Sequence, residues 1–480
     1  MRGHHTNLIK PRSSMETIVT EIIKTIKDSD TVIERDMKLL ALFFELFRTA
    51  LGIALEQLDR ELATEYKKQG YIVERRDRRT VQCLCGTVSF VRRRMKKPGK
   101  KGIYPLDKQL RLKPYQRFSA LLMKKVAETA TSCVYRKTAD IVNRFTLTNL
   151  SHQAVKHIVM QSGKLCEEWQ DIQRQETPTE ETEAPVVYIE GDGMVLRGQH
   201  KKQLEIHRMQ VYEGREKEGK RTRLIHAYHI ASTEYEKTWD RAGWYMHRHY
   251  GLSHTIVISN GDGGTGYGYE AFQELAAGCK WHEHQRDVYH IHRKVKERLH
   301  FAAPEVQEGI RKSIWNHDET RLALWLDTAE SEAEGNDELQ DVERLRKYLT
   351  RNWTYVEPLN QRQMPEKVHL IQPGACEAGH RIYSYRMKHQ GRCWSQEGAE
   401  AMVQLITAMK NEEWDAVYDQ WGHTAYKPIS QRFKNIMRKV MKRVPMQPHK
   451  GVHQGNIGTY SSASSPLGKL AKGLQMAHIL

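Results

Sequence analysis

The stretch IVISNGDGGTGY, residues 256–267, runs from a short β-branched apolar segment into glycines that surround one carboxylate, Asp262. This pattern predicts a strand that ends in a loop and leads into a helix over YGYEAFQELAAG. The letters GDGGTG also match the dinucleotide-binding pattern G-x-G-x-x-G. We reject that interpretation because a dinucleotide-binding unit opens its domain with this strand, whereas other strands precede it here. In addition, Asp262 would place negative charge where the pyrophosphate should sit.

Three further segments before this stretch have the alternation of strands. They are PVVYIEGDGMVL (185–196), LEIHRMQVYEG (204–214) and RLIHAYHIAS (223–232), and a helix with Trp239 and Trp244 follows them. The order strand, strand, strand, helix, strand, helix predicts an α/β domain with a mixed sheet.

Two of these strands end in a Gly-Asp-Gly, which places Asp192 and Asp262 in corresponding positions. Two carboxylates within about 4 Å of each other would repel by roughly 4 kcal/mol at an effective dielectric constant near 20, so their convergence requires a cation. Hard oxygen ligands suit Mg²⁺ or Mn²⁺. The alternative is that both are turn aspartates, and for either residue alone this is the simpler interpretation.

A third carboxylate is expected farther along the chain. Residues 300–370 are charged and helical in pattern, without a strand signal, as in a helical insertion. Beyond them, Glu377 opens a predicted helix within GACEAGHRIYSYRMKHQ. Its rivals for the role are Glu397 and Glu400, although their helix has the pattern of core packing. Glu190, two residues before Asp192 on the same strand face, competes with Asp192 for the assignment as metal ligand.

The N-terminal part combines helix and cations. Residues 15–68 have apolar side chains at helical spacing, which predicts packing or a partner helix, and residues 75–102 have the pattern of a β-hairpin. The chain holds 76 Lys and Arg against 59 Asp and Glu, a net charge of +17, which favours a polyanionic partner. The hairpin is therefore either a phosphate-contacting ribbon or a solvated basic face. Its candidate DNA-binding residues are Arg78, Arg79, Arg92, Arg93 and Arg94.

Residues 116–164 predict two helices joined by a short turn, with Ser151 as the N-cap of the second helix. The exposed face of that helix would carry His152, Gln153 and Lys156, as in the recognition helix of a helix-turn-helix. An ordinary helical hairpin with polar residues outside is the alternative. The acidic segment ETPTEETEAP (176–185) reads as a linker, with a domain boundary near residue 183.

The triplet Asp192, Asp262 and Glu377, with a helical insertion before the glutamate, resembles the RNase H-like catalytic domain of bacterial DDE transposases. The chain is most similar to insertion-sequence transposases of the ISLre type, relatives of the Mutator-like group. The resemblance implies that these three acids bind catalytic Mg²⁺ or Mn²⁺. It rests on RRTVQCLCGTVSFVRRR, YPLDKQL, YIEGDG, ISNGDGG, DVYHIHRKV and ACEAGHRIYSYRMKHQGRCWSQEGAEAM.

The resemblance also bears on a histidine that follows the second aspartate. Mutator-like enzymes carry a Cys or Asp, two residues and a His there, and this sequence offers Cys279 to His282 and Asp287 to His290. We prefer the second frame, because Arg293 follows His290 at a matching interval. Asp287, His290 and Arg293 would then support the site or hold the scissile strand. The alternative is a zinc cluster of His282, His284, His290 and His292.

The activity that the resemblance implies is metal-dependent cleavage at the ends of a mobile element, followed by transfer of the freed 3′-hydroxyl to another phosphodiester. The partners would be terminal inverted repeats and target DNA, bound by a homodimer or higher oligomer, with Arg386 and Lys388 among the DNA contacts. Two alternatives are a sequence-specific DNA-binding protein on an inactive nuclease scaffold and a metallonuclease without strand transfer.

The sequence therefore predicts an α+β multidomain protein in the bacterial cytoplasm, associated with the nucleoid. No segment approaches the roughly 18 consecutive apolar residues that span a bilayer, so we expect no membrane contact. The expected parts are an N-terminal helical region (1–70), a basic hairpin and helix-turn-helix-like DNA-binding region (71–183), a first part of an RNase H-like catalytic core (184–300), a helical insertion (301–370), a last part of the core with the Glu377 helix (371–425), and a basic tail (426–480) that contacts DNA or ends free.

Overall fold

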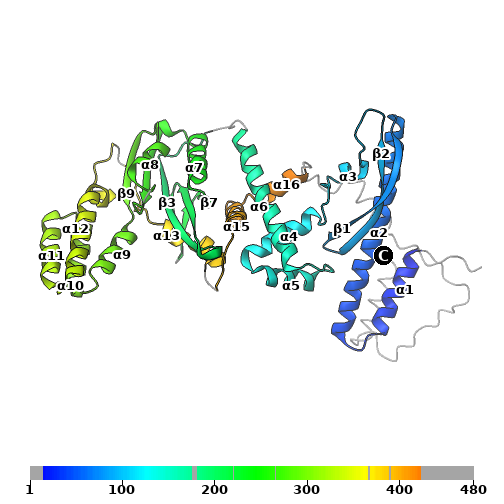
Figure 1. The fold of residues 1–480 in the computed structure, drawn as a ribbon, viewed down its shortest axis with the longest axis horizontal. Coiled ribbons are helices and arrows are strands. Elements are labelled where there is room, and N and C mark those ends of the chain that lie inside the picture. The colour runs from blue at the N-terminus through cyan, green and yellow to red at the C-terminus, as the bar shows by residue number, and fades with distance from the viewer. Residues whose placement is uncertain are drawn as a thin grey trace, which may run out of the picture. The chain divides into compact units, whose positions relative to one another are not determined.

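The computed structural model describes residues 14–175, 181–219, 221–264, 266–365, 368–388 and 391–422, all within one compact unit. The predicted basic tail and the first half of the predicted linker lie outside these ranges. The described part combines helices with a five-stranded mixed sheet, which confirms the α+β class (Figure 1). Among the described helices none is long and apolar enough to cross a membrane.

The N-terminal part consists of helices α1 (Ser14–Lys27) and α2 (Val32–Lys68) and the antiparallel strands β1 (Ile72–Cys83) and β2 (Gly86–Lys96). The predicted helix over 15–68 is thus interrupted once, where the Thr31 side chain accepts a hydrogen bond from the Glu34 amide at 3.1 Å and starts α2. The predicted hairpin is confirmed. Its apolar face packs on the C-terminal half of α2, where Val88 and Phe90 are buried.

Four helices follow the hairpin: α3 (Pro105–Gln109), α4 (Ala120–Ser132), α5 (Tyr135–Phe145) and α6 (His152–Gln175). The predicted N-cap at Ser151 is confirmed, because its hydroxyl accepts a hydrogen bond from the Ala154 amide at 3.1 Å. His152, Gln153 and Lys156 are exposed on α6, as expected.

The central sheet has the strand order β7-β4-β3-β8-β9. The first two pairings are antiparallel, and β8 and β9 run parallel to β3. The predicted strand over 223–232 is divided, because β6 (Arg221–Ile225) leaves the sheet to pair with β5 (Gly214–Glu218). The sheet strands are β3 (Val186–Arg197), β4 (Gln203–Tyr212), β7 (Tyr228–Ser232), β8 (Ile256–Gly261) and β9 (Trp281–Arg286).

Helices α7 (Tyr235–His249) and α8 (Tyr269–Leu275) cover one face of this sheet, where Ile189 and Val257 meet Phe272. The other face carries Tyr188 and Ile258, which pack against the segment around 359–375. Alternation along each strand therefore divides the sheet between two apolar clusters. Short 3₁₀ helices lie at Gln199–Lys201, Leu252–His254 and Leu359–Gln361.

The predicted helical insertion is confirmed as α10 (Pro304–Trp315), α11 (Glu319–Glu332) and α12 (Asn336–Val356). It has a hydrophobic core of its own, shared with α9 (Val288–Arg298). The insertion is thus attached to the sheet through the helix that directly follows β9.

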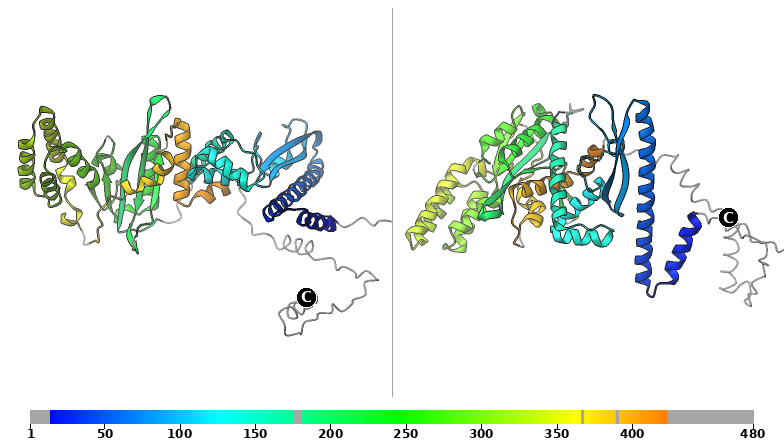
Figure 2. Two further views of the ribbon diagram at one scale, coloured as in Figure 1. Left: turned by 90° about the horizontal axis from the view of Figure 1, so that it is seen from below. Right: turned by 45° about the vertical axis from the view of Figure 1, so that its right-hand side comes forward.

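The last described helices are α13 (Cys376–Gly379), α14 (Arg381–Met387), α15 (Gln396–Lys410) and α16 (Trp414–Gly422). Helix α15 packs against both α6 and β7, as Figure 2 shows. The crossing with α6 is so close that a Cβ at Gly163 would lie 2.6 Å from Ala401 Cα. One hydrophobic cluster joins α4, α5 and α6 to α14, α15, α16 and the strand ends, so the expected boundary near residue 183 does not separate two cores.

Candidate active site where β3 and β8 separate

The two predicted aspartates follow paired residues on neighbouring strands. Gly191 of β3 and Gly261 of β8 are register partners in a parallel ladder, and Asp192 and Asp262 come directly after them. Because neighbouring strands lie about 4.8 Å apart, both carboxylates emerge at the same edge of the sheet. Asp262 directly follows the end of β8, as predicted, but the expectation that Asp192 ends its strand was wrong, because β3 continues to Arg197 in its pairing with β4. The parallel ladder brings the two aspartates to neighbouring positions from 70 residues of separation.

Asp192 is buried, with 6% of its surface exposed, and all its contacts are polar. One carboxylate oxygen accepts the Gly193 amide at 2.7 Å, and the other lies 2.7 Å from His380 Nε2 and 3.4 Å from His290 Nε2. Burial by itself would raise the pKa of Asp192, but the hydrogen bonds with the two histidines outweigh it and hold that pKa well below its ordinary value. Asp192 is therefore ionised at neutral pH.

Asp262 is half-buried in the loop that follows β8. Its Oδ1 accepts a hydrogen bond from the Gly264 amide at 2.7 Å, which leaves the second oxygen outside this turn. Gly263 has φ +75°, and a Cβ there would lie 2.1 Å from the guanidinium of Arg286. The glycine thus lets the loop close over the end of β9.

The backbone around Glu377 is fixed to the sheet by two buried charges. Glu190 of β3 accepts hydrogen bonds from three consecutive amides, those of Gly374 and Ala375 at 3.1 Å and that of Cys376 at 2.9 Å. Arg208, the partner of Asp192 in β4, donates to the Cys376 carbonyl at 2.6 Å. Since His380 then contacts Asp192, both ends of α13 are held beside the first aspartate. The side chain of Glu377 lies outside the described set.

The carboxylates that compete with Asp192 and with Glu377 are placed differently. Glu190 is fully buried, and its carboxylate is occupied by the α13 amides, Asn260 and Tyr212. Glu400 accepts hydrogen bonds from Ser232 and Thr233 at the end of β7, and Glu397 is exposed. The expectation that Glu190 competes as a metal ligand is therefore corrected: its role is to anchor α13.

A buried polar chain connects the anchor of α13 to His290. Asn260 Nδ2 lies 3.2 Å from Glu190 Oε2 and 3.3 Å from Asp287 Oδ2. Asp287 caps α9 by accepting the amides of Tyr289 at 2.8 Å and His290 at 3.4 Å, and burial raises its pKa. Asp287 thus sets the start of the helix that carries His290. The pKa of His290 is raised by its hydrogen bond with Asp192 and also by the carboxylates of Asp287 and Asp262.

The other candidate motif, Cys279 to His282, does not place its histidine beside Asp192. His282 and His284 both lie against the hydroxyl of Ser259, at 2.7 and 2.8 Å, and neither contacts Asp192. Within the described ranges no group of three or more His, Cys, Asp or Glu side chains is arranged to hold a metal ion. Of the two frames, the one that begins at Asp287 is the one whose histidine lies beside Asp192.

Arg293 lies one turn beyond His290 and is exposed, with its Nε 2.6 Å from Glu297. With Lys294, Arg298 and Arg344 it lines an open hollow between α9 and α12, next to His290. This flank of the site is mainly basic.

His380 was not singled out in the sequence. Its signal is a Glu-x-x-His spacing after Glu377, which places the two residues about one helical turn apart. Arg208 had no sequence signal, because an arginine in an alternating strand looks like any solvent-facing position.

Several expected DNA-binding arginines have internal partners instead. Arg79 and Arg92 both pair with Asp107, Arg93 pairs with the buried Asp59 at 2.5 Å, and Arg94 pairs with Glu74. Arg79 and Arg92 hold the hairpin against α3 and Arg93 holds it against α2, whereas Arg94 pairs within the hairpin because Glu74 lies on β1. The expected DNA contacts of these four arginines stay predictions. Arg78 is exposed, so its DNA contact stays a prediction, as do those of His152, Gln153 and Lys156.

The expectation for Arg386 is also corrected. This residue is 3% exposed, donates from Nε to the Ala130 carbonyl at 2.7 Å, and has its guanidinium over the Trp394 ring. Burial lowers its pKa to about 10. Arg386 joins α14 to α4, whereas Lys388 is half-exposed and keeps its predicted role.

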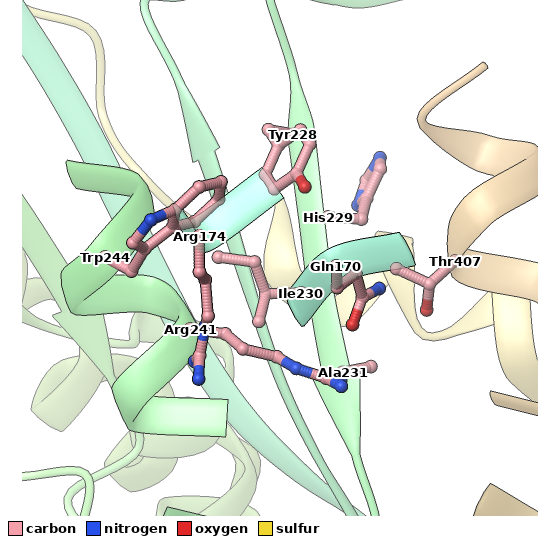
Figure 3. A pocket seen from close by; sticks show the side chains of 9 residues that line it. All are labelled: Gln170, Arg174, Tyr228, His229, Ile230, Ala231, Arg241, Trp244 and Thr407. Atoms are coloured by element: carbon pink, nitrogen blue, oxygen red, sulfur yellow. The ribbon is translucent and has the colours of Figure 1, made fainter. Parts of the chain in front are cut away.

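A small, partly enclosed cavity lies between α6, α7, β7 and α15 (Figure 3). Trp244 Nε1, His229 Nδ1 and Gln170 Oε1 are buried there without a hydrogen-bond partner among the described residues. A small polar enclosure of this kind suits buried water. Its lining residues are Gln170, Arg174, Tyr228, His229, Ile230, Ala231, Arg241, Trp244 and Thr407.

Comparison with known proteins gives a family without an assigned activity. The model of UPF0236, described as an uncharacterised protein family, matches residues 27–422. A UPF0236 protein in the vanSb 3′ region of Streptococcus gallolyticus is 34% identical over 460 residues, which cover 95% of this chain and 99% of that protein. Two relatives come from Caldanaerobacter subterraneus subsp. tengcongensis. The name of one of them joins four designations. It is 23% identical to this chain over 451 residues, which cover 91% of this chain and 90% of the relative. The name of the other joins eleven designations. It is 21% identical to this chain over 470 residues, which cover 95% of this chain and 94% of the relative.

Proposed function

This chain belongs to the UPF0236 family, and we propose that it is a DDE-type DNA transposase of an insertion sequence, with an RNase H-like catalytic core. It would cut DNA at the ends of the element and join the freed 3′-hydroxyl to target DNA. The catalytic residues would be Asp192, Asp262 and Glu377.

The observation that carries this proposal is the attachment of α13 beside Asp192. Glu190 and Arg208 hold Cys376, and His380 contacts Asp192. The backbone of Glu377, between these two points, is therefore held beside Asp192. In our proposal the Glu377 carboxylate joins those of Asp192 and Asp262, and three carboxylates so close together would need a cation.

The donor set fits a hard divalent cation. Asp192 is ionised at neutral pH, and Asp262 has one oxygen outside its own turn. With Glu377 they would offer only carboxylate oxygens, the ligands that Mg²⁺ and Mn²⁺ prefer. When bound, these ions would promote attack on a phosphodiester and stabilise the leaving oxygen.

The protein's own residues prepare the site for this chemistry. His290 and His380 hold the Asp192 carboxylate in one orientation, and Asp287 fixes the helix of His290. The basic flank with Arg293 and Lys294 would receive the DNA phosphates next to the carboxylates.

The names of the relatives give independent support. One sequence with eleven designations in one organism fits a gene present in many copies, and a transposing element produces such copies. An ordinary DNA-binding protein or repair nuclease has no reason to multiply in this way.

The experiment is a cleavage and joining assay with labelled DNA that carries the element's ends, in Mg²⁺, in Mn²⁺ and in EDTA. We expect metal-dependent cuts with 3′-hydroxyl ends and strand-transfer products. The Asp262→Asn variant should lose both by more than about 1000-fold and still bind DNA. Asp240→Asn, an exposed aspartate on α7, is the matched control and should be fully active.

Two results would replace the proposal with one of its alternatives. DNA binding without cuts in either metal would indicate a DNA-binding protein on an inactive scaffold. Cuts without any joined product would indicate a metallonuclease.

A further inference from the structure

The helical hairpin formed by α1 and the first half of α2 has no buried residue of its own. Along the described side chains from Glu16 onward, the first buried position is Gly52. The second half of α2 differs, because β1 and β2 cover it and Asp59 and Ala63 are buried there. Helices of this kind are stabilised mainly by packing of an apolar face, so the first half lacks its packing partner.

Five of the seven large apolar side chains that are exposed on α2 form one stripe, which we call the α2 stripe: Ile33, Met37, Leu40, Phe43 and Phe47. Their spacings of four, three, three and four residues place them on one helix face. Each is between 51% and 70% exposed. Scattered apolar residues on a surface are normal, but a continuous stripe over four turns marks an interaction site.

The charge of this region points to a protein partner. Residues 14–51 hold seven acidic and five basic side chains, a net charge of −2, in a chain whose net charge is +17. Nucleic acid would be attracted to the rest of the molecule and not to this hairpin. Charged side chains beside the stripe also pair with each other, as Glu34 does with Lys38 at 2.6 Å. Two copies of this surface would therefore not repel each other through an excess of one charge.

We propose that the α2 stripe is the interface between two copies of this chain. A stripe on a straight helix face is self-complementary, which suits the two-fold pairing of identical surfaces, and two hairpins would together form a four-helix arrangement. Helix α1 packs on α2 and adds Ile23 and Ile26, which are 47% and 48% exposed. At roughly 100 Å² each, the seven side chains offer about 700 Å² per copy, close to the about 800 Å² of a standard interface.

The test is sedimentation of the full-length protein without DNA. We expect a mass of twice 56.0 kDa. The double variant Met37→Glu, Phe43→Glu should raise the dissociation constant at least about 100-fold, because it would bury unpaired charges. Both positions are more than 60% exposed, so the helical circular dichroism should not change. Leu324→Glu on α11, 62% exposed, is the matched control and should leave the dimer intact.

Several outcomes would overturn the proposal. A wild-type protein that stays monomeric at its solubility limit would do so, and slow hydrogen exchange over residues 33–47 in that monomer would show that the chain covers the stripe itself. A double variant that remains dimeric would place the interface elsewhere, and a control that dissociates equally would show that the effect is not specific to the stripe. None of these readouts depends on cleavage activity, so the proposed chemistry can fail without affecting this result.

Discussion

Nε2 of His380 lies 2.7 Å from Oδ2 of Asp192, although 188 residues separate the two in the sequence. The contact joins the segment after α13 to the strand that carries the first aspartate. Together with the hydrogen bonds from the backbone amides of residues 374–376 to Glu190, it fixes the backbone of Glu377, the proposed third acid, beside Asp192.

The first prediction concerns His380 as a positioning residue. His380→Ala should leave Asp192 ionised but less well oriented, so that end cleavage falls about 10- to 100-fold and the half-saturating Mg²⁺ concentration rises. His282→Ala is the control, because His282 contacts Ser259 and not Asp192. Single-turnover cleavage across a Mg²⁺ titration measures both quantities, and equal losses in the two variants would contradict a specific role of His380.

The second prediction concerns the anchor of α13. Glu190→Gln replaces one acceptor oxygen with an amide group that faces backbone N–H groups, and it should cost about 2–4 kcal/mol of unfolding free energy. Cleavage should fall more than about 100-fold, and hydrogen exchange at residues 374–380 should accelerate more than elsewhere. Glu397→Gln, exposed on α15, should change neither. Unchanged exchange at α13 would contradict the anchoring role.

Sequence patterns predicted the features that depend on residues close together in the sequence. Four of the five sheet strands and the insertion helices follow from apolar periodicity, but β9 (WHEHQR) was missed because it has almost no apolar residues. Asp192 and Asp262 were found because each lies in a Gly-Asp-Gly after an apolar strand segment, although β3 continues beyond Asp192. Glu377 was proposed as the first residue of a predicted helix, but only the resemblance to a family favoured it over Glu397 and Glu400, since a four-residue helix has no periodicity.

Contacts between distant side chains could not be predicted. Arg79 and Arg92 look like any solvated cation run until the fold brings Asp107 to them. Likewise, nothing in the order of residues distinguishes Glu190 from a metal ligand. The role of Glu190 becomes clear only in the fold, where backbone amides more than 180 residues farther along the chain donate hydrogen bonds to its carboxylate.

The third prediction concerns pH. Glu413 is buried, its Oε1 accepts from the Tyr228 hydroxyl at 3.0 Å, and burial raises its pKa to about 7. A raised carboxyl pKa means that the stabilisation is complete below about pH 4.5 and is lost as the pH rises through about 7. The loss should be about 2–3 kcal/mol, because the folded state must then ionise a buried group.

Thermal unfolding between pH 5 and pH 8 tests this linkage. We expect the wild-type Tm to fall as the pH rises, and Glu413→Gln to remove most of that fall. Glu412→Gln, at an exposed neighbouring position, should behave like the wild type. A pH dependence that survives in Glu413→Gln would assign the effect to another group.

The fourth prediction separates structural arginines from DNA-binding ones. Arg79→Ala removes a 7%-exposed guanidinium that contacts Asp107 and the Lys113 carbonyl, and should cost about 2–4 kcal/mol in urea unfolding. Arg78→Ala, at an exposed neighbour, should cost less than about 0.5 kcal/mol. It should instead weaken DNA binding and lower the slope of log affinity against log salt concentration by about one, the release of one counterion. Wild-type affinity in Arg78→Ala would exclude that arginine from the DNA contact.

Because Glu190 holds a segment that is synthesised much later, the site cannot be complete until translation has passed α13. A ribosome adds about 5–20 residues per second, so the 188 residues between Asp192 and His380 take roughly 10–40 s to synthesise. Throughout that interval the nascent chain has the strand of the first aspartate but not the segment that Glu190 will hold. Under the proposed function, the basic hairpin would therefore meet DNA before Glu377 is in place, and a chain interrupted before residue 376 would occupy DNA without cutting it.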